Sequence, residues 1–476
     1  MDGSERAGGF FGNASIYIAG SIVVSILSLL TIKILTGNLS IGQYGQLSLF
    51  VQVIALTPLL ISLGSEAPIG VDVIKVGPNS REFGQLVFSV LVMMTLVFGL
   101  LIITRENSLI RVFLEFIEFE EELWFRAIIV GYLIGIIKIG QSILLKTERA
   151  LLLVTSRLLV AFLLLGFANL LVVGRKGGVI GAVDSYLIAN ATVGIIIAIS
   201  LLAIFGIKFD FGVLKSSLSF STPLIPHYVA TWALISSDQF VISKQLTLEE
   251  VGIYSLGYSI ASIIALVTSN ASLAFSPKFM KIIKSERDNV DQINTFVRSY
   301  SYSLVVLICL FYSFTPILVE FLGSGLYTDS NDVIPLVIIG MYFQGMYMLC
   351  ITPIFYDKRG VTIAIISVLS ASLNIALNII LVGKYGISVA ALSTAVCYSM
   401  QLFLTFWFWP ASLVQRESMI GLLKSIALLL IFILIIGKVL EFGILIGTIA
   451  ALVISMSVAY FTLPRIKFVM NFNPIV

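Results

Sequence analysis

The chain is poor in charge and in reactive side chains. Only 12% of its 476 residues are Asp, Glu, Lys or Arg, and it has one histidine and three cysteines. Cys309, Cys350 and Cys397 lie far apart inside apolar runs without metal-ligand spacing. We therefore expect buried thiols, no metal site and no cofactor. The net charge of +3 and the scattered basic residues do not suit a nucleic-acid-binding protein.

Long polar segments are also missing, which excludes a soluble catalytic domain. Hydrophobic residues make up 58% of the chain instead, and no water-soluble domain carries so apolar a surface. Apolar runs of about 20 residues, enough to cross a bilayer as a helix, recur along the whole chain. They are continuous rather than alternating, which favours helices over a barrel. The sequence therefore predicts an all-α polytopic membrane protein whose first helix is too long for a cleaved signal.

Charges, glycines and prolines divide the apolar runs into about fourteen transmembrane helices. With a cytoplasmic N-terminus, 19 Lys and Arg fall in cytoplasmic segments and 8 in outer segments. By the positive-inside rule both termini are cytoplasmic. The spans are expected near 14–36, 44–66, 84–104, 124–147, 151–173, 180–206, 217–243, 251–273, 299–322, 333–356, 361–382, 386–409, 420–437 and 442–462.

Two internal matches indicate that a six-helix unit is duplicated. Residues 39–49 match residues 246–256 at an offset of 207, and residues 169–177 match residues 378–386 at an offset of 209. Six crossings leave both copies with the same polarity, so an axis along the membrane normal should relate them. This predicts an N-terminal lobe over 1–210, a C-terminal lobe over 211–409, and a terminal helix pair within 410–476.

Five motifs in the chain are informative when they are taken together. They are Pro223-Leu-Ile-Pro226, Ser237-Asp238-Gln239-Phe240, residues 249–256 (EEVGIYSL), residues 374–391 (NIALNIILVGKYGISVAA) and Gln43-Tyr44-Gly45. These motifs resemble those of the polysaccharide flippases of the multidrug/oligosaccharidyl-lipid/polysaccharide exporter superfamily, and the resemblance covers roughly residues 14–409. The chain departs from the family pattern at Ser388, where glycine is common, and at Lys33, where arginine is common.

This resemblance implies a transporter of the cytoplasmic membrane. It would flip an oligosaccharide linked to a polyprenyl (pyro)phosphate from the cytoplasmic to the outer leaflet, by alternating access, for polysaccharide or glycoconjugate biosynthesis. The implied partners are the lipid-linked oligosaccharide, membrane lipids and other polysaccharide-assembly membrane proteins.

Lys138 is the most informative charge within a span. Small residues mark a helix face that packs against protein, and a charge at depth is costly unless water, a partner or a ligand meets it. We expect Lys138 to line a cavity and attract the substrate phosphate, with an internal salt bridge or snorkelling as the alternatives. Its helix face also carries Ala127, Gly131, Gly135, Ser142 and Arg149.

His227, the only histidine, follows Pro223 and Pro226. Two prolines remove backbone donors, so this helix should be bent or unwound, a state tolerated at membrane depth only in protein or beside a cavity. His227 is then a cavity residue or a hydrogen-bonded core histidine. Asp238 shares its face and is expected to cap the helix or, alternatively, to pair with His227 in an outer gate.

Five further side chains are candidates. Lys33, near the outer end of the first span, suits gating or snorkelling. Arg149 and Arg157 flank the inner turn between the fourth and fifth spans and either receive the substrate phosphate or set the topology. Asn374 and Asn378 share a small, polar face of the eleventh span. They suit sugar hydroxyls, but helix–helix hydrogen bonds are favoured.

A cation-coupled exporter of drugs or metabolites is the first alternative function. Its bacterial members would have an Asp in the first helix, and residues 14–36 contain no acid. Lys138 and His227 suit an anionic ligand better, because a phosphate is desolvated only against donors and positive charge. A lipid II flippase fits the same chemistry and stays open.

A membrane glycosyltransferase, ligase or polymerase acting on lipid-linked sugars is the other alternative. Such an enzyme needs carboxylates or a base in a sizeable outer loop. The outer loops here are short and lack D-x-D, and no nucleophile elbow or P-loop occurs. We therefore expect a transporter and not an enzyme.

Overall fold

The computed structural model describes residues 3–104, 121–285, 290–357, 359–409 and 416–470. All regular structure within these ranges is helical, and twelve helical stretches are long and apolar enough to cross a membrane. The predicted all-α multi-pass architecture is confirmed. The chain divides into two compact units: unit 1 holds Met1–Trp232 with Thr247–Gly252, and unit 2 holds Ala233–Leu246 with Ile253–Val476.

Each of the fourteen expected spans corresponds to a helix or to a broken helix. Two of them fall outside the twelve stretches: α10, and α18, whose apolar part Ile444–Tyr460 is shorter. The helices are α1 (Gly3–Asn38), α2 (Ile41–Ser62), α3 (Glu66–Lys75), α4 (Arg81–Ile103), α6 (Glu121–Lys146), α7 (Ala150–Ala168), η2 (Asn169–Gly174), α8 (Gly178–Phe205), α9 (Phe211–Ser221), η3 (Thr222–Leu224), α10 (Ile225–Gln245), α11 (Leu248–Ser285), α12 (Val290–Gly323), α13 (Ser330–Cys350), α14 (Thr352–Tyr356), α15 (Gly360–Tyr385), α16 (Ile387–Trp407), α17 (Arg416–Leu440) and α18 (Ile444–Met470).

The expected seventh span is interrupted, as its prolines predict. α9 ends at Ser221, a 3-10 turn follows, and α10 begins at Ile225. Pro223 stands at the start of the 3-10 turn, where its missing N–H is tolerated. The sequence predicted that this span starts at 217, whereas α9 begins at Phe211. Asp210 caps this helix start, because its side chain accepts a hydrogen bond from the Val213 N–H at 3.1 Å.

The expected second span also divides, which the sequence did not predict. α2 ends at Ser62, Leu63 and Gly64 take left-handed conformations with φ of 49° and 71°, and the short helix α3 begins at Glu66. α3 is not among the twelve candidate membrane spans. The turn therefore places Glu66 at a helix start rather than at the end of a span.

The repeated sequence motif begins a helix in the same way in both copies. Ser40 accepts a hydrogen bond from the Gln43 N–H at 3.2 Å, and the Gln43 side chain accepts one from the Ser40 N–H, forming a capping box for α2. In the second copy Thr247 accepts a hydrogen bond from the Glu250 N–H at 3.3 Å, just before α11. The local polar residues of both motifs thus serve to start a helix.

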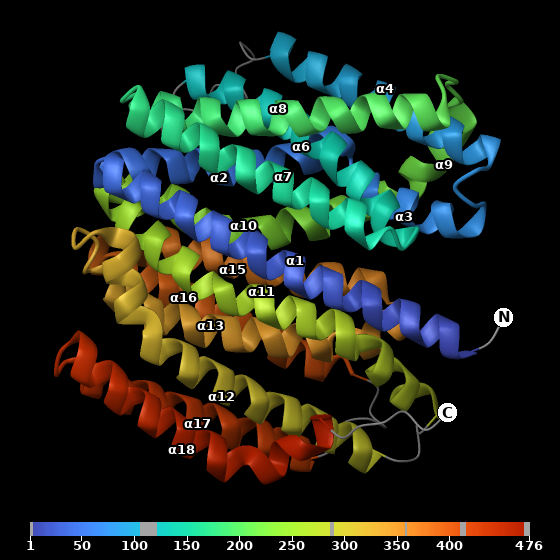
Figure 1. Ribbon diagram of the computed structural model, residues 1–476. Coiled ribbons are helices and arrows are strands. Elements are labelled where there is room, and N and C mark those ends of the chain that lie inside the picture. Colours follow the sequence, from blue (N-terminus) through green and yellow to red (C-terminus); the bar gives the residue numbers. More distant parts are fainter. Residues whose placement is uncertain (1–2, 105–120, 286–289, 358, 410–415, 471–476) are drawn as a thin grey trace. The chain divides into compact units, whose positions relative to one another are not determined.

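Unit 1 is a bundle in which α6 is central. α6 packs against α2, α4, α7 and α8, while α1 packs along α7 (Figure 1). Small residues let these backbones approach: a Cβ on Gly131 would overlap the side chain of Thr57 on α2. The buried residues of α4 and the C-terminal half of α6 belong to one apolar cluster that includes Val90, Met94 and Ile139.

Unit 2 is organised around α12 and α13. α12 packs against α13, α17 and α18, and α16 packs against α13 and α15. Hydrogen bonds link α12, α13 and α17 through Ser301, Tyr342 and Ser425. The terminal pair α17 and α18 thus belongs to this unit. The two-lobe division at 210 and 409 stays a prediction, and the boundary between the compact units falls within α10.

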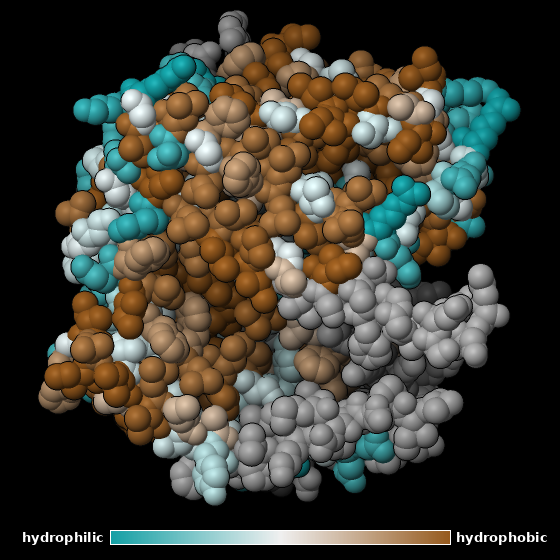
Figure 2. Space-filling view, viewed as in Figure 1, coloured by the Kyte–Doolittle hydropathy of each residue, from teal (hydrophilic) through white to brown (hydrophobic). Residues whose placement is uncertain are grey.

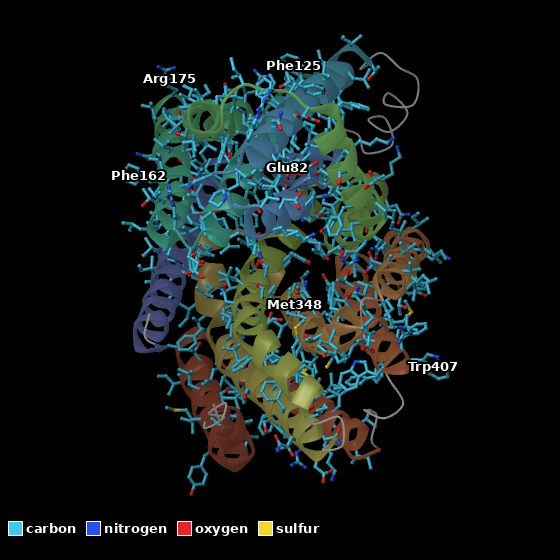
Figure 3. All side chains as sticks on the ribbon, turned by 90° about the vertical axis from the view of Figure 1, so that its right-hand side faces the viewer. Glu82, Phe125, Phe162, Arg175, Met348 and Trp407 are labelled. Carbon is cyan, nitrogen blue, oxygen red and sulfur yellow. The ribbon has the colours of Figure 1, made fainter. Side chains whose placement is uncertain are left out.

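The outer surface of the helices is apolar, as a bilayer requires. Figure 2 shows hydrophobic side chains over the middle of the visible helices of unit 1, with hydrophilic ones at their ends. Phe162 on α7 is 63% exposed and Trp407 on α16 is 83% exposed, and both lie at the edge of their own bundle in Figure 3. Cys309, Cys350 and Cys397 are buried and unpaired, so the prediction of core thiols is confirmed.

Candidate functional site

Lys138 lies on the small-residue face of α6. Its neighbours Ile137 and Ile139 are buried, whereas the Lys138 side chain is exposed. One turn away on the same face, a Cβ on Gly135 would lie 2.7 Å from the Met94 methyl, so this face packs closely against α4. Within the described residues Lys138 makes no ion pair or hydrogen bond, which leaves its amine available to a ligand.

Glu66 is the acid that accompanies Lys138, and the sequence analysis did not identify it. Ser142 donates a hydrogen bond to the Glu66 carbonyl at 3.2 Å, which fixes the start of α3 on α6 one turn from Lys138. Burial raises the pKa of the Glu66 carboxyl, and the positive charge of Lys138 opposes that rise. The available signal was the Leu63-Gly64 turn, which ends the span before Glu66.

Tyr228 and His227, at the start of α10, extend this group within unit 1. Tyr228 interacts electrostatically with Glu66, and its ring centroid is 5.6 Å from that of the half-buried His227. We name Lys138, Glu66, Tyr228 and His227 the Lys138 group. Within this group the charge of Lys138 acts on Glu66, and His227 lies next to Tyr228.

Asp238 lies inside α10, where it is fully buried. Its carboxylate accepts hydrogen bonds from the Thr394 hydroxyl at 2.6 Å, from the Asn378 amide at 2.6 Å and from the Tyr254 hydroxyl. The expected helix-capping role is wrong, because these bonds join four helices and none goes to a backbone N–H at a helix end. The carboxylate also lies about 16 Å along α10 from His227, too far for the alternative gate pair.

Asn374 and Asn378 complete this buried network in unit 2. Asn374 accepts a hydrogen bond from Ser237 at 3.0 Å and donates one to Thr394 at 3.0 Å. Asn378 donates to Asp238 and, at 3.3 Å, to Asn374. Both asparagines are fully buried, so they make the helix–helix hydrogen bonds that the sequence favoured. We name these residues, with Ser237, Tyr254, Asp238 and Thr394, the Asp238 network.

The Asp238 network contains no cation among the described residues. A buried carboxylate without a counter-ion depends on every neutral donor around it, because desolvation of the charge is costly. These hydrogen bonds therefore fix the positions of α10, α11, α15 and α16 relative to one another. Tyr254 belongs to the EEVGIYSL motif, but nothing in the sequence distinguished Thr394, whose role depends on helix packing.

The remaining sequence candidates stay apart from these groups. Lys33 is half-buried on α1 and has an interaction partner. Arg149 stands at the N-cap of α7 and Arg157 two turns further along, and both side chains are exposed. The two arginines therefore present charge along the first half of α7, and among the described residues no hydrogen bond or ion pair joins them to the Lys138 group.

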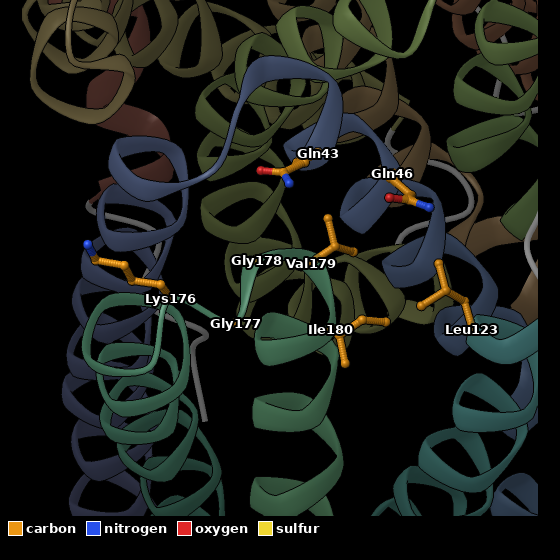
Figure 4. A pocket seen from close by; sticks show the side chains of 8 residues that line it. All are labelled: Gln43, Gln46, Leu123, Lys176, Gly177, Gly178, Val179 and Ile180. Carbon is orange, nitrogen blue, oxygen red and sulfur yellow. The ribbon is translucent and has the colours of Figure 1, made fainter.

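A polar pocket of about 310 Å³ lies at the other end of unit 1 (Figure 4). Gln43 and Gln46 from the first turns of α2 and the Gly177-Gly178 turn before α8 line it. Gly178 has a φ of 55°, a left-handed conformation that favours glycine. In the predicted topology this pocket is at the outer surface. Among the described residues, no group of three His, Cys, Asp or Glu could hold a metal ion.

The arrangement of helices is shared with several solved structures of membrane transporters. The structure is similar to the lipid II flippase MurJ in an inward closed conformation, with a TM-score of 0.71 over 94% of this chain and 99% of that chain, at 17% identity. It is also similar to an inward-facing multidrug resistance MATE family transporter of the MOP superfamily, with a TM-score of 0.63 over 87% and 98% of the two chains at 13% identity. A Vibrio cholerae MATE transporter matches with a TM-score of 0.58 over 89% and 98%, at 14% identity. The chain has the fold that these proteins share.

The sequence shows the family to which the chain belongs. Residues 34–332 match the family model described as polysaccharide biosynthesis protein, and the chain belongs to that family. Protein 1 of the Lsg locus of Haemophilus influenzae is 24% identical over 161 residues, which are 33% of this chain and 40% of that protein. This chain thus matches less than half the length of that curated relative.

Proposed function

We propose that this protein flips a lipid-linked oligosaccharide, anchored through a polyprenyl phosphate or diphosphate, from the cytoplasmic to the outer leaflet. The observation that carries the proposal is the exposed side chain of Lys138 well inside the span α6, without an ion-pair partner among the described residues. The family match and the shared transporter fold support a translocation function in polysaccharide biosynthesis. No bond is made or broken in this function, and no cofactor is needed.

The position of Lys138 along α6 supports this role. It lies eight residues before Lys146, the last residue of α6, which corresponds to about 12 Å of helix. At that depth an unpaired ammonium is costly, so an anionic ligand that pairs with it is stabilised. His227, next to Tyr228, adds a hydrogen-bond donor for the same headgroup.

Glu66 gives the site a way to release its ligand. Its carboxylate acts on Lys138 when no substrate is bound, and a phosphate competes with it for the same positive charge. The exchange keeps Lys138 from binding the phosphate so tightly that the lipid cannot leave.

The membrane potential favours the proposed direction. Outward movement of an anion across 100 mV, inside negative, is favourable by about 2.3 kcal/mol per charge. A diphosphate with about two charges gains about 4 to 5 kcal/mol, which is sufficient without a coupling ion. The proposal places the protein in the cytoplasmic membrane, with both termini cytoplasmic and with other polysaccharide-assembly proteins as partners.

A lipid II flippase is the second candidate, because lipid II carries the same diphosphate next to a sugar. The Lys138 group suits the phosphate of either lipid, so the sugar must be tested directly. A cation-coupled drug exporter would need an acid open to a cation. Asp238 is closed by hydroxyl and amide donors, and Glu66 already interacts with the positive charge of Lys138.

The experiment uses the purified full chain in liposomes with a fluorescent oligosaccharide on a polyprenyl diphosphate. Transfer between leaflets is followed by loss of accessibility to a membrane-impermeant quencher, under an imposed potential. Lys138→Ala should abolish transfer, and Lys138→Arg should keep part of it, because the charge remains while the geometry changes. Lys146→Ala removes the same charge from the end of the same helix and is the matched control.

Normal transfer by Lys138→Ala, in protein that accumulates and purifies like the unmodified chain, would contradict the phosphate-binding role. Equal transfer of lipid II and of the oligosaccharide lipid would show that the headgroup sugar is not selected. Transfer of lipid II alone would establish the second candidate.

A further inference from the structure

A second pocket, of about 280 Å³, lies where α4 begins and α8 ends in unit 1. Its walls include Asn79 and Ser80 before α4, Arg81 and Gln85 in its first turns, and Phe205 and Lys208 at the end of α8. None of the residues of the Lys138 group or the Asp238 network contributes to it.

The walls of this pocket are held together by specific contacts. A Cβ on Gly84 would lie 2.6 Å from the Phe205 carbonyl oxygen, so only glycine permits this approach of the two helix ends. The rings of Phe83 and Phe205 meet edge to face at 5.3 Å. The Ser89 hydroxyl accepts a hydrogen bond from the Asp210 N–H at 2.8 Å, which fixes the turn that carries Lys208.

The lining is cationic and contains no acid. Arg81 and Lys208 are exposed, and neither makes an ion pair or hydrogen bond with another described residue. Two acids are near in sequence, Glu82 beside Arg81 and Asp210 after Lys208, and neither lines the pocket. The Asp210 carboxylate accepts a hydrogen bond from the Val213 N–H. Two free cations with the amides of Asn79 and Gln85 form a donor set that suits a phosphate oxygen.

Exposed apolar side chains lie near Lys208 in the sequence, and one of them, Ile204, lines the pocket. Ile204 is 67% exposed, Ile207 is 76% exposed and Phe209 is 46% exposed, all within four residues of Lys208. Large apolar side chains next to an exposed lysine are typical of a chain segment at the boundary between acyl chains and headgroups. Both α4 and α8 are candidate membrane spans, so their ends lie at that boundary.

We propose that this pocket binds the phosphate group of an anionic phospholipid, a phosphodiester such as that of phosphatidylglycerol. In the predicted topology it faces the cytoplasmic leaflet, where the turns 76–80 and 206–210 both lie. The cations bind the phosphate, and the exposed apolar side chains near Lys208 contact the acyl chains. This lipid is separate from the transported one, and the inference does not depend on the proposed transport function.

The experiment measures lipid binding to the purified full chain by native mass spectrometry. Phosphatidylglycerol is compared with phosphatidylcholine of the same acyl chains, because the zwitterionic lipid retains the phosphodiester but has no net charge. Phosphatidylglycerol should bind more tightly to the unmodified chain. The double variant Arg81→Gln with Lys208→Gln should weaken the binding of phosphatidylglycerol by about 25-fold. Lys208→Gln alone, which lies in an exposed turn, should weaken it by about fivefold.

The matched control is Lys75→Gln with Lys215→Gln, which removes two exposed lysines from the same predicted side of unit 1 without altering the pocket lining. This control should bind phosphatidylglycerol like the unmodified chain. If both double variants lost the same amount of phosphatidylglycerol binding, the effect would come from general surface charge and the assigned site would be wrong. Equal binding of the two lipids by the unmodified chain would also overturn the proposal. Displacement of phosphatidylglycerol by millimolar inorganic phosphate would identify a free-phosphate site instead.

Discussion

Gly45 of α2 and Gly252 of α11 each lie against the first turn of the other's helix. A Cβ on Gly45 would overlap the Leu248 carbonyl oxygen, and a Cβ on Gly252 would overlap the Ile41 carbonyl oxygen. Leu248 and Gly252 follow Ile41 and Gly45 by the same 207 residues. The two copies of the repeated motif therefore meet each other around a local two-fold relation. This supports the duplication inferred from sequence, while superposition of the two whole lobes stays a prediction.

Gly45→Ala and Gly252→Ala should each destabilise the protein by about 1 to 3 kcal/mol, because a methyl group would force the backbones apart. The double variant should lose less than the sum, since both changes disturb one contact. Thermal unfolding of the detergent-purified chain measures this. Gly99→Ala in α4, where a Cβ would meet nothing within 4 Å, is the control and should be neutral or slightly stabilising. Strict additivity would argue against a shared contact.

Asp238→Asn should also destabilise the protein, by about 1 to 3 kcal/mol, because an amide N–H₂ would face donors that now bond to a carboxylate oxygen. Tyr254→Phe removes one of the three donors and should cost about 1 kcal/mol. The same unfolding measurement applies, with the exposed Asp329→Asn at the start of α13 as control. If Asp238→Asn were as stable as that control, the network would have no structural role.

Glu66 should make substrate binding depend on pH. Because burial raises the pKa of its carboxyl, Glu66 takes up its proton at a higher pH than an ordinary glutamate. As the pH falls, its negative charge is lost and Lys138 is left free for the phosphate. The apparent KM for the oligosaccharide lipid should therefore fall as the pH falls. Glu66→Gln should have the low KM at every pH.

The control for this prediction is the double variant Glu66→Gln with Lys138→Ala, which should behave like Lys138→Ala alone. Liposome transfer rates at several substrate concentrations and pH values supply the KM. A pH dependence that persists unchanged in Glu66→Gln would assign it to another group, such as His227.

The topology predicts that a reporter joined after Val476 is cytoplasmic, because the cytoplasmic segments then hold 19 basic residues against 8. A reporter enzyme active only outside the membrane should be inactive there and active when inserted after Lys176, in the turn between η2 and α8. The opposite pattern would reverse the frame and move the phospholipid pocket to the outer leaflet.

The sequence determined the architecture because the bilayer leaves so few choices. A backbone in hydrocarbon must satisfy its own hydrogen bonds, so each apolar run of sufficient length becomes a helix. The helix interruption at Pro223 was also predictable from the local sequence, because proline lacks the N–H that a continuous helix needs. Ser40 and Thr247 cap the helices that follow them, and this too depends on neighbours along the chain.

Only the tertiary structure decided what the polar residues do. Asp238 was expected to cap a helix, but its partners Asn378 and Thr394 come from helices 140 and 156 residues further along the chain. Glu66 was not identified because its importance depends on a left-handed turn at Gly64 and on the packing of α3 against α6. Hydropathy shows that a helix crosses the membrane, but which of its polar side chains meet depends on the rotation of each helix about its axis. That rotation is fixed by close packing between helices distant in sequence.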